Sequence, residues 1–185
     1  MSVFSERNLV LSRLKLGELP GVNAIIGSAH HDACLVCLHE SEHSSGVNLK
    51  VQGDFDLSFT VLWDDVYDDQ MQRSWNDLED ATEWGTGGIA FLLILELTEY
   101  TVIRRSRKGT GFDYWLGDKD AHYRLPFQDA ARLEVSGILR AEKESDIKKR
   151  VKRKLVQIGK SDSSGLPGYV VIVEFSRPVA HVVMK

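Results

Sequence analysis

Two acidic residues stand alone in apolar segments whose residue types are typical of β-strands. Asp113 lies in the segment 112–116, and Glu134 lies in the segment 132–139. A charged side chain is costly to bury unless something compensates its charge, so each acid needs a partner or a function. A divalent metal ion bound by the two carboxylates would compensate their charge and give them a function. The sequence therefore predicts Asp113 and Glu134 as a metal-binding pair.

Such a pair needs secondary structure that brings the two strands together. Apolar periodicity predicts one helix over residues 71–97 and a second, amphipathic helix over residues 142–158. Strands are predicted over residues 100–105, 112–116, 132–139, 169–175 and 179–184. Gly85, Gly87 and Gly88 interrupt the first helix, and they predict either a break or a close approach of another backbone segment there.

The first third of the chain has a different character. Strand-like segments at 33–39, 47–52 and 57–63 are separated by turn-rich stretches and predict a small antiparallel meander. Residues 8–19 fit either a strand or a short helix. The expected fold class is mixed α/β (α+β) with a mixed central sheet. An acidic, β-rich extension over residues 1–66 would join a core over residues 67–185 in one compact unit.

The predicted elements follow the order helix, three strands, helix and strand. Glu83 lies on the first helix, and the acid pair lies on the second and third strands. This arrangement resembles the core of the PD-(D/E)XK nuclease superfamily. The resemblance covers roughly the last two-thirds of the chain and implies a restriction-endonuclease-like fold. It also implies that Asp113 is the metal-binding aspartate, that Glu134 is the acid of the acidic-x-lysine motif, and that Glu83 completes the metal site. The implied activity is hydrolysis of phosphodiester bonds in DNA with Mg²⁺ or Mn²⁺, as in restriction, repair or anti-phage defence.

The sequence departs from this superfamily at Ser136, which stands two residues after Glu134 where the motif has a catalytic lysine. A lysine displaced to the basic helix could replace it, and Lys148 and Lys152 are the predicted candidates, with Arg140 as another cation nearby. The alternative is that the chemistry has been lost. The chain would then be a catalytically inactive module that assembles with a protein partner through its acidic front half.

The charge distribution divides the chain. The first 100 residues carry 5 Lys and Arg against 17 Asp and Glu, whereas the remaining residues carry 18 against 10, so net charges of -12 and +8 add to the overall -4. Basic clusters suit a nucleic-acid backbone, because phosphate neutralisation dominates its binding. The predicted contacts are Arg104, Arg105, Arg107, Lys108, Lys149 and Arg153. A solvated helix face with internal ion pairs is the alternative explanation of the basic helix.

The remaining soft-ligand and aromatic residues suggest weaker alternatives. Cys34 and Cys37 lie in a predicted strand, where positions three apart face opposite sides, so neither a disulfide nor a shared metal is expected. A zinc site would have to draw on these cysteines and on the nearby histidines His30, His31, His39 and His43. Trp75, Trp84 and Trp115 are expected in the core, with base stacking as the alternative. A small-molecule enzyme is disfavoured, because no phosphate-binding glycine motif is present.

Targeting signals are not evident in the sequence. The chain starts without a basic stretch leading into an apolar one, and the longest apolar run, residues 89–95, is too short to cross a bilayer. We therefore expect a soluble, cytoplasmic protein without membrane contact, which could also form oligomers.

Overall fold

The computed structural model describes residues 7–120 and 128–185. Its helices are α1 (Ala24–Glu40), α2 (Asp69–Ser74), α3 (Leu78–Leu97) and α4 (Glu144–Ile158), with 3₁₀ helices η1 (Leu11–Leu16) and η2 (Gly159–Ser164). Its strands are β1 (Asn8–Val10), β2 (Val47–Gly53), β3 (Leu57–Leu62), β4 (Tyr100–Arg105), β5 (Tyr114–Asp118), β6 (Ala131–Ile138), β7 (Gly168–Glu174) and β8 (Val179–Met184).

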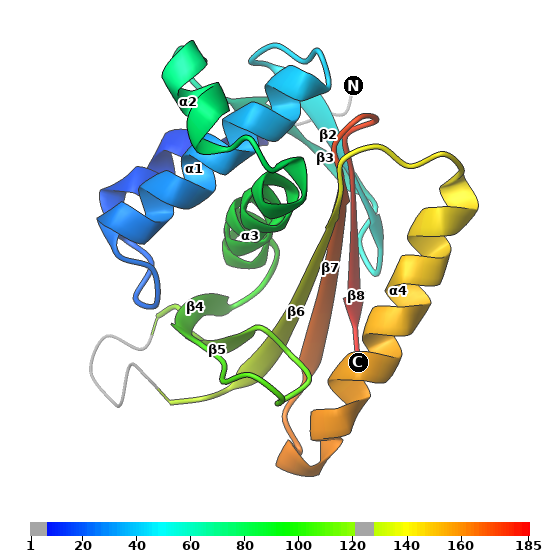
Figure 1. Cartoon of the computed structure of the whole chain (residues 1–185). Helices are drawn as coiled ribbons and strands as arrows, with labels where there is room; N and C mark the ends of the chain where they lie inside the picture. The colour runs from blue at the N-terminus through cyan, green and yellow to red at the C-terminus, as the bar shows by residue number, and fades with distance from the viewer. Residues whose placement is uncertain (1–6, 121–127) are drawn as a thin grey trace, which may run out of the picture.

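The strands of the described residues form one mixed sheet in the order β1-β3-β2-β8-β7-β6-β5-β4. Helices α1 and α3 cover one face and α4 covers the other (Figure 1). Successive strand residues point to opposite faces, and β7 shows the result. Its Val171 and Val173 join the main core on the α3 side, whereas Val170 and Ile172 join a smaller cluster beneath α4.

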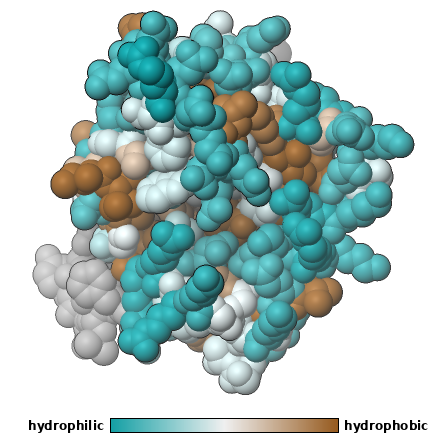
Figure 2. Space-filling model, viewed as in Figure 1, coloured by the Kyte–Doolittle hydropathy of each residue, from teal (hydrophilic) through white to brown (hydrophobic). Residues whose placement is uncertain are grey.

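Helix α4 is amphipathic, as its sequence predicts. Ile147 and Ile158 are buried against the sheet, and the basic residues between them lie mostly on the exposed side. In the view of Figure 2, the side of the molecule where α4 runs is mainly hydrophilic. The apolar stripe fixes the helix on the sheet, and the opposite face remains open to solvent.

The second half of the chain follows the predicted order of elements. Strands β4 to β8 and helix α4 confirm the predictions with shifts of one or two residues at their ends. The predicted helix over residues 71–97 is instead two helices. The first ends at Ser74, and Asp77 caps the start of α3 by accepting from the backbone amide of Glu79 at 2.8 Å. The glycines do not break α3. They allow the close approach that the sequence also predicted, because a Cβ on Gly85 would lie 3.0 Å from the carbonyl oxygen of Ala33.

The predicted strand over residues 33–39 is wrong, since these residues belong to α1. Its apolar run is buried between α3 and η1, and a helix buried all round loses the periodicity that marks an amphipathic one. The hairpin of β2 and β3 is confirmed as antiparallel, and residues 8–19 contain both a short strand and a 3₁₀ helix. Because β2 also pairs in parallel with β8, one sheet continues from the predicted extension into the predicted core.

Cys34 and Cys37 therefore lie on a helix and not on a strand. Both are free and buried, and the Cys34 thiol donates to the carbonyl oxygen of Gly85 at 3.0 Å. Among the residues that the structure describes, no helix combines the length and apolar character needed to cross a membrane.

Candidate functional site

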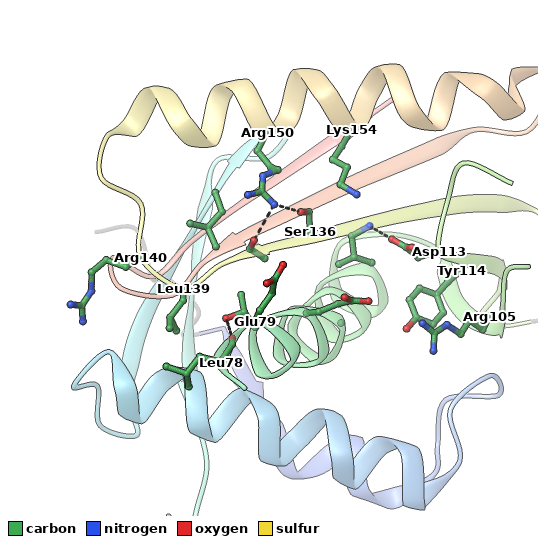
Figure 3. Close-up of a pocket in the computed structure, with 16 residues that line it drawn as sticks. Leu78, Glu79, Arg105, Asp113, Tyr114, Ser136, Leu139, Arg140, Arg150 and Lys154 are labelled. Carbon is green, nitrogen blue, oxygen red and sulfur yellow. Dashed lines mark hydrogen bonds between the residues drawn. The ribbon is translucent and has the colours of Figure 1, made fainter. Parts of the chain in front are cut away.

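A cleft opens where β5 separates from β6. Strand β5 pairs with β6 only along Ala131–Leu133, whereas β7 pairs with the other edge of β6 as far as Ile138. Beyond Leu133 the free edge of β6 faces a pocket of about 590 Å³ between α3 and α4 (Figure 3). Its walls are formed by Leu78, Glu79, Thr82, Glu83 and Gly87 of α3, by Arg105, Asp113 and Tyr114, by residues 135–140, and by Arg150 and Lys154 of α4.

Asp113 is fixed at the entrance to β5. Its backbone amide donates to the carbonyl oxygen of Leu133 at 2.9 Å, and its Oδ2 accepts from the backbone amide of Val135 at 2.8 Å. The two bonds hold the carboxylate against the edge of β6. The half-buried side chain therefore faces the pocket from a defined position.

Glu134 lies on the neighbouring strand and is fully buried, at 0% exposure. Its Oε1 accepts from the Lys154 ammonium and, at 2.8 Å, from Gln157 Nε2. Its Oε2 has no hydrogen-bond partner in the described part of the chain. Burial, and then the negative charge of Asp113, raise the pKa of Glu134 to about 7 even though Lys154 opposes the shift. The two acids are thus close enough to interact, as the sequence predicted.

An unpartnered carboxylate oxygen beside a second carboxylate fits a hard cation such as Mg²⁺. The third predicted ligand is less well placed. Glu83 is exposed on α3 and lines the same pocket, but residues 7–120 and 128–185 contain no group of three or more His, Cys, Asp or Glu side chains placed to hold a metal ion. The structure brings together Asp113 and Glu134, and it places Glu83 on the opposite wall.

Lys154 is the basic residue that bonds to Glu134, and it is not among the lysines predicted from the sequence. Lys148 and Lys152, the predicted candidates, do not line the pocket: both are exposed, and Lys148 pairs with Glu144 at 3.0 Å. Lys154 follows Ile147 by seven residues and precedes Ile158 by four. That spacing places it on the buried face of α4 and could have identified it.

Ser136 bonds to a basic residue of α4. Its hydroxyl accepts from Arg150 Nη1 at 3.0 Å, and the same nitrogen donates to the carbonyl oxygen of Gly137 at 3.5 Å. Figure 3 shows Arg150 and Lys154 pointing from α4 toward the strands, with Arg140 and Arg105 on opposite sides of the view. Arg140 is thus one of four described basic residues that line the pocket, and it lies at the other end of the view from Asp113.

The other predicted nucleic-acid contacts lie outside the pocket. Arg104 pairs with Asp129 at 2.5 Å and stacks over Trp115, with its guanidinium carbon 5.3 Å from the ring centre. Lys149 pairs with Asp146 at 3.8 Å. Arg107, Lys108 and Arg153 are exposed, so they form basic surface on the β4–β5 connection and on α4.

The tryptophans and the cysteine-histidine segment mainly have packing roles. Trp75 and Trp84 pack with ring centres 6.0 Å apart, and Trp115 meets Phe112 edge-on at 4.6 Å. His30 contacts the carbonyl oxygen of Trp84 through Nδ1 at 2.7 Å, and burial lowers its pKa to about 4. These contacts explain why such polar and aromatic side chains lie inside the fold.

A scan of the chain against models of protein families gives no match, and a search of curated protein sequences gives none either.

Proposed function

We propose that this chain is a metal-dependent nuclease of the PD-(D/E)XK type that hydrolyses phosphodiester bonds in DNA. The proposal is carried by one observation: Asp113 lines the cleft and lies close to the buried Glu134 of β6, and a lysine from α4 bonds to Glu134.

The arrangement of the sheet supports the proposal. Strands β4, β5 and β6 are antiparallel neighbours, and α4 crosses over to β7, which runs parallel to β6. The resemblance implies one acid on the helix before these strands and one acid at each of the second and third strands. We also propose that the sheet has the restriction-endonuclease-like topology of this superfamily.

The residues present would divide the work as follows. Asp113 and the free oxygen of Glu134 would hold Mg²⁺ or Mn²⁺, with Glu83 available from the opposite wall. When bound, the metal would lower the pKa of a ligand water and supply the attacking hydroxide. Lys154 would take the place of the motif lysine, because its ammonium can stabilise the charge that develops on the phosphate. Arg105 would contact the substrate backbone.

Cleavage assays test this proposal. Purified protein is incubated with labelled single- and double-stranded DNA in Mg²⁺, Mn²⁺ or EDTA, and we expect metal-dependent cleavage that disappears in Asp113→Asn. In Lys154→Met we expect a loss of about 10²- to 10⁴-fold, the usual contribution of a positioned proton-transfer or charge-stabilising group. Lys50→Met is the matched control, because Lys50 is exposed on β2 and does not line the pocket. Cleavage that survives in Asp113→Asn or needs no metal would disprove the assignment.

A catalytically inactive module is the second candidate, and the state of Glu134 favours it. Lys154 and Gln157 already occupy one oxygen of this acid, and no third acid joins the pair within the described residues. If titration calorimetry detects no Mg²⁺ binding, cleavage is absent, and a protein partner binds the acidic front half, this second candidate replaces the first.

A further inference from the structure

Arg150 is a basic residue of the pocket to which the proposed hydrolysis gives no role. It lies one helical turn before Lys154 on the same face of α4, and its side chain is half buried in the cleft. Ser136 and the Gly137 carbonyl hold one of its nitrogens, so the guanidinium has a fixed position.

No carboxylate of the described residues lies in direct contact with this guanidinium, and Glu79 of α3 acts on it only through the field of its charge. Within residues 7–120 and 128–185, Arg150 forms no ion pair with Asp or Glu, and neither do Arg105 and Arg140. Burial and the nearby Arg153 lower the pKa of Arg150, so the surroundings of this side chain disfavour its positive charge. Arginine has five N–H donors in a planar fork, and the two acceptors present use only one nitrogen. The remaining donors suit an anion that binds in two places, as phosphate does.

The position of Arg150 relative to Lys154 identifies the anion. Side chains four residues apart on a helix have Cβ atoms about 5–6 Å apart. Consecutive phosphates of one nucleic-acid strand rise about 3.4 Å along the duplex axis and are farther apart in space, because the backbone winds around that axis. A strand with one phosphate near Lys154 therefore brings the next within reach of the long Arg150 side chain.

We infer that Arg150, held by Ser136, forms a phosphate subsite for the phosphodiester next to the cleaved phosphodiester. This inference rests on the proposed function. The substrate is then a polynucleotide strand with at least two consecutive phosphates. Ser136 is a positioning residue in this subsite, since it acts through Arg150.

The test measures binding without catalysis. A fluorescein-labelled DNA 12-mer is titrated in EDTA at several salt concentrations, and anisotropy gives the Kd. In Arg150→Met we expect the Kd to rise about tenfold, as for a lost hydrogen bond to a charged group. The slope of log K against log salt should decrease by about 0.7, the value for one contact on a single strand. Ser136→Ala should decrease this slope by a smaller amount. Ser136→Thr, which keeps a hydroxyl group, should have the same slope as the wild type. Arg73→Met, on exposed α2, is the control.

The outcomes separate this inference from the proposed function. Unchanged Kd and salt slope in a folded Arg150→Met protein would overturn the subsite even if DNA is cleaved, and so would failure of the wild-type protein to bind the strand. A decreased slope together with no cleavage in Mg²⁺ or Mn²⁺ would support phosphate binding by Arg150 and reject the nuclease. Melting temperatures of all variants show whether a loss of binding reflects a loss of folding.

Discussion

Replacing Glu134 with glutamine should change how the stability of the metal-free protein depends on pH. The pKa of this buried acid is about 7 in the folded protein against an ordinary value of 4.5. Because folding raises the pKa, the folded state favours the protonated form. The resulting stability is fully present below pH 4.5 and is lost as the pH rises through 7.

The size of the effect follows from the shift. A difference of 2.5 pKa units at about 1.36 kcal/mol per unit gives about 3 kcal/mol. Glutamine cannot ionise, so Glu134→Gln should not lose this stability. Between about pH 4 and pH 8 the variant should therefore gain about 3 kcal/mol relative to the wild type.

Urea unfolding in EDTA, followed by circular dichroism at several pH values, measures this difference. Asp65 and Asp162 have lowered pKa values and act in the opposite direction, as their contribution is lost in acid, but both proteins share them. Glu99→Gln, at an exposed position on the α3–β4 connection, is the matched control and should show no pH-dependent difference. If Glu134→Gln and the wild type differ by the same free energy at both ends of the range, the account of the buried acid is refuted.

Three further predictions concern the scaffold. Gly137→Ala should destabilise the protein by about 1–3 kcal/mol in urea unfolding, because its methyl group would overlap two threonines of α3; Gly159→Ala, which meets chiefly the flexible end of a lysine, should cost less. Cys34 and Cys37 should react with a thiol reagent only after unfolding, because both are buried and burial raises the pKa of Cys37 to about 12; rapid labelling of the native protein would contradict this. Asn23→Ala should cost about 1 kcal/mol in the same unfolding assay, since it removes the side-chain cap of α1, and an unchanged stability would show that the cap is dispensable.

The sequence predicted the second half of the fold well because its elements carry distinct signals. Strand β7 is a continuous apolar run buried on both faces, and α4 has one apolar stripe in a basic segment. The segment that became α1 has neither signal. Apolar residues flank its cysteines in the sequence without a helical period. The segment forms a helix because it packs between α3 and η1.

The candidate site was predicted in part for a similar reason. Asp113 and Glu134 were identifiable because an isolated acid in an apolar strand is unusual. Lys154 was not identified, because six of the seven residues 148–154 are basic and only its spacing from Ile147 and Ile158 distinguishes it from the exposed ones. The exposed position of Glu83 and the Ser136–Arg150 bond likewise depend on how α3, β6 and α4 are arranged.

The parallel pairing of β2 with β8 has a consequence for folding kinetics. It joins Lys50 to Val179 and continues to Gly53 and Val182. Within residues 7–120 and 128–185, the hairpin of β2 and β3 therefore reaches strands β4 to β7 only through a strand about 130 residues later. Contacts so distant in sequence form slowly, since the closure of a long loop must precede them. During synthesis the edge of β2 would remain unpaired until β8 emerges, and an unpaired strand edge is a site where chains associate wrongly. The hairpin of β2 and β3 therefore joins the sheet only after the strand that follows the candidate site has been made.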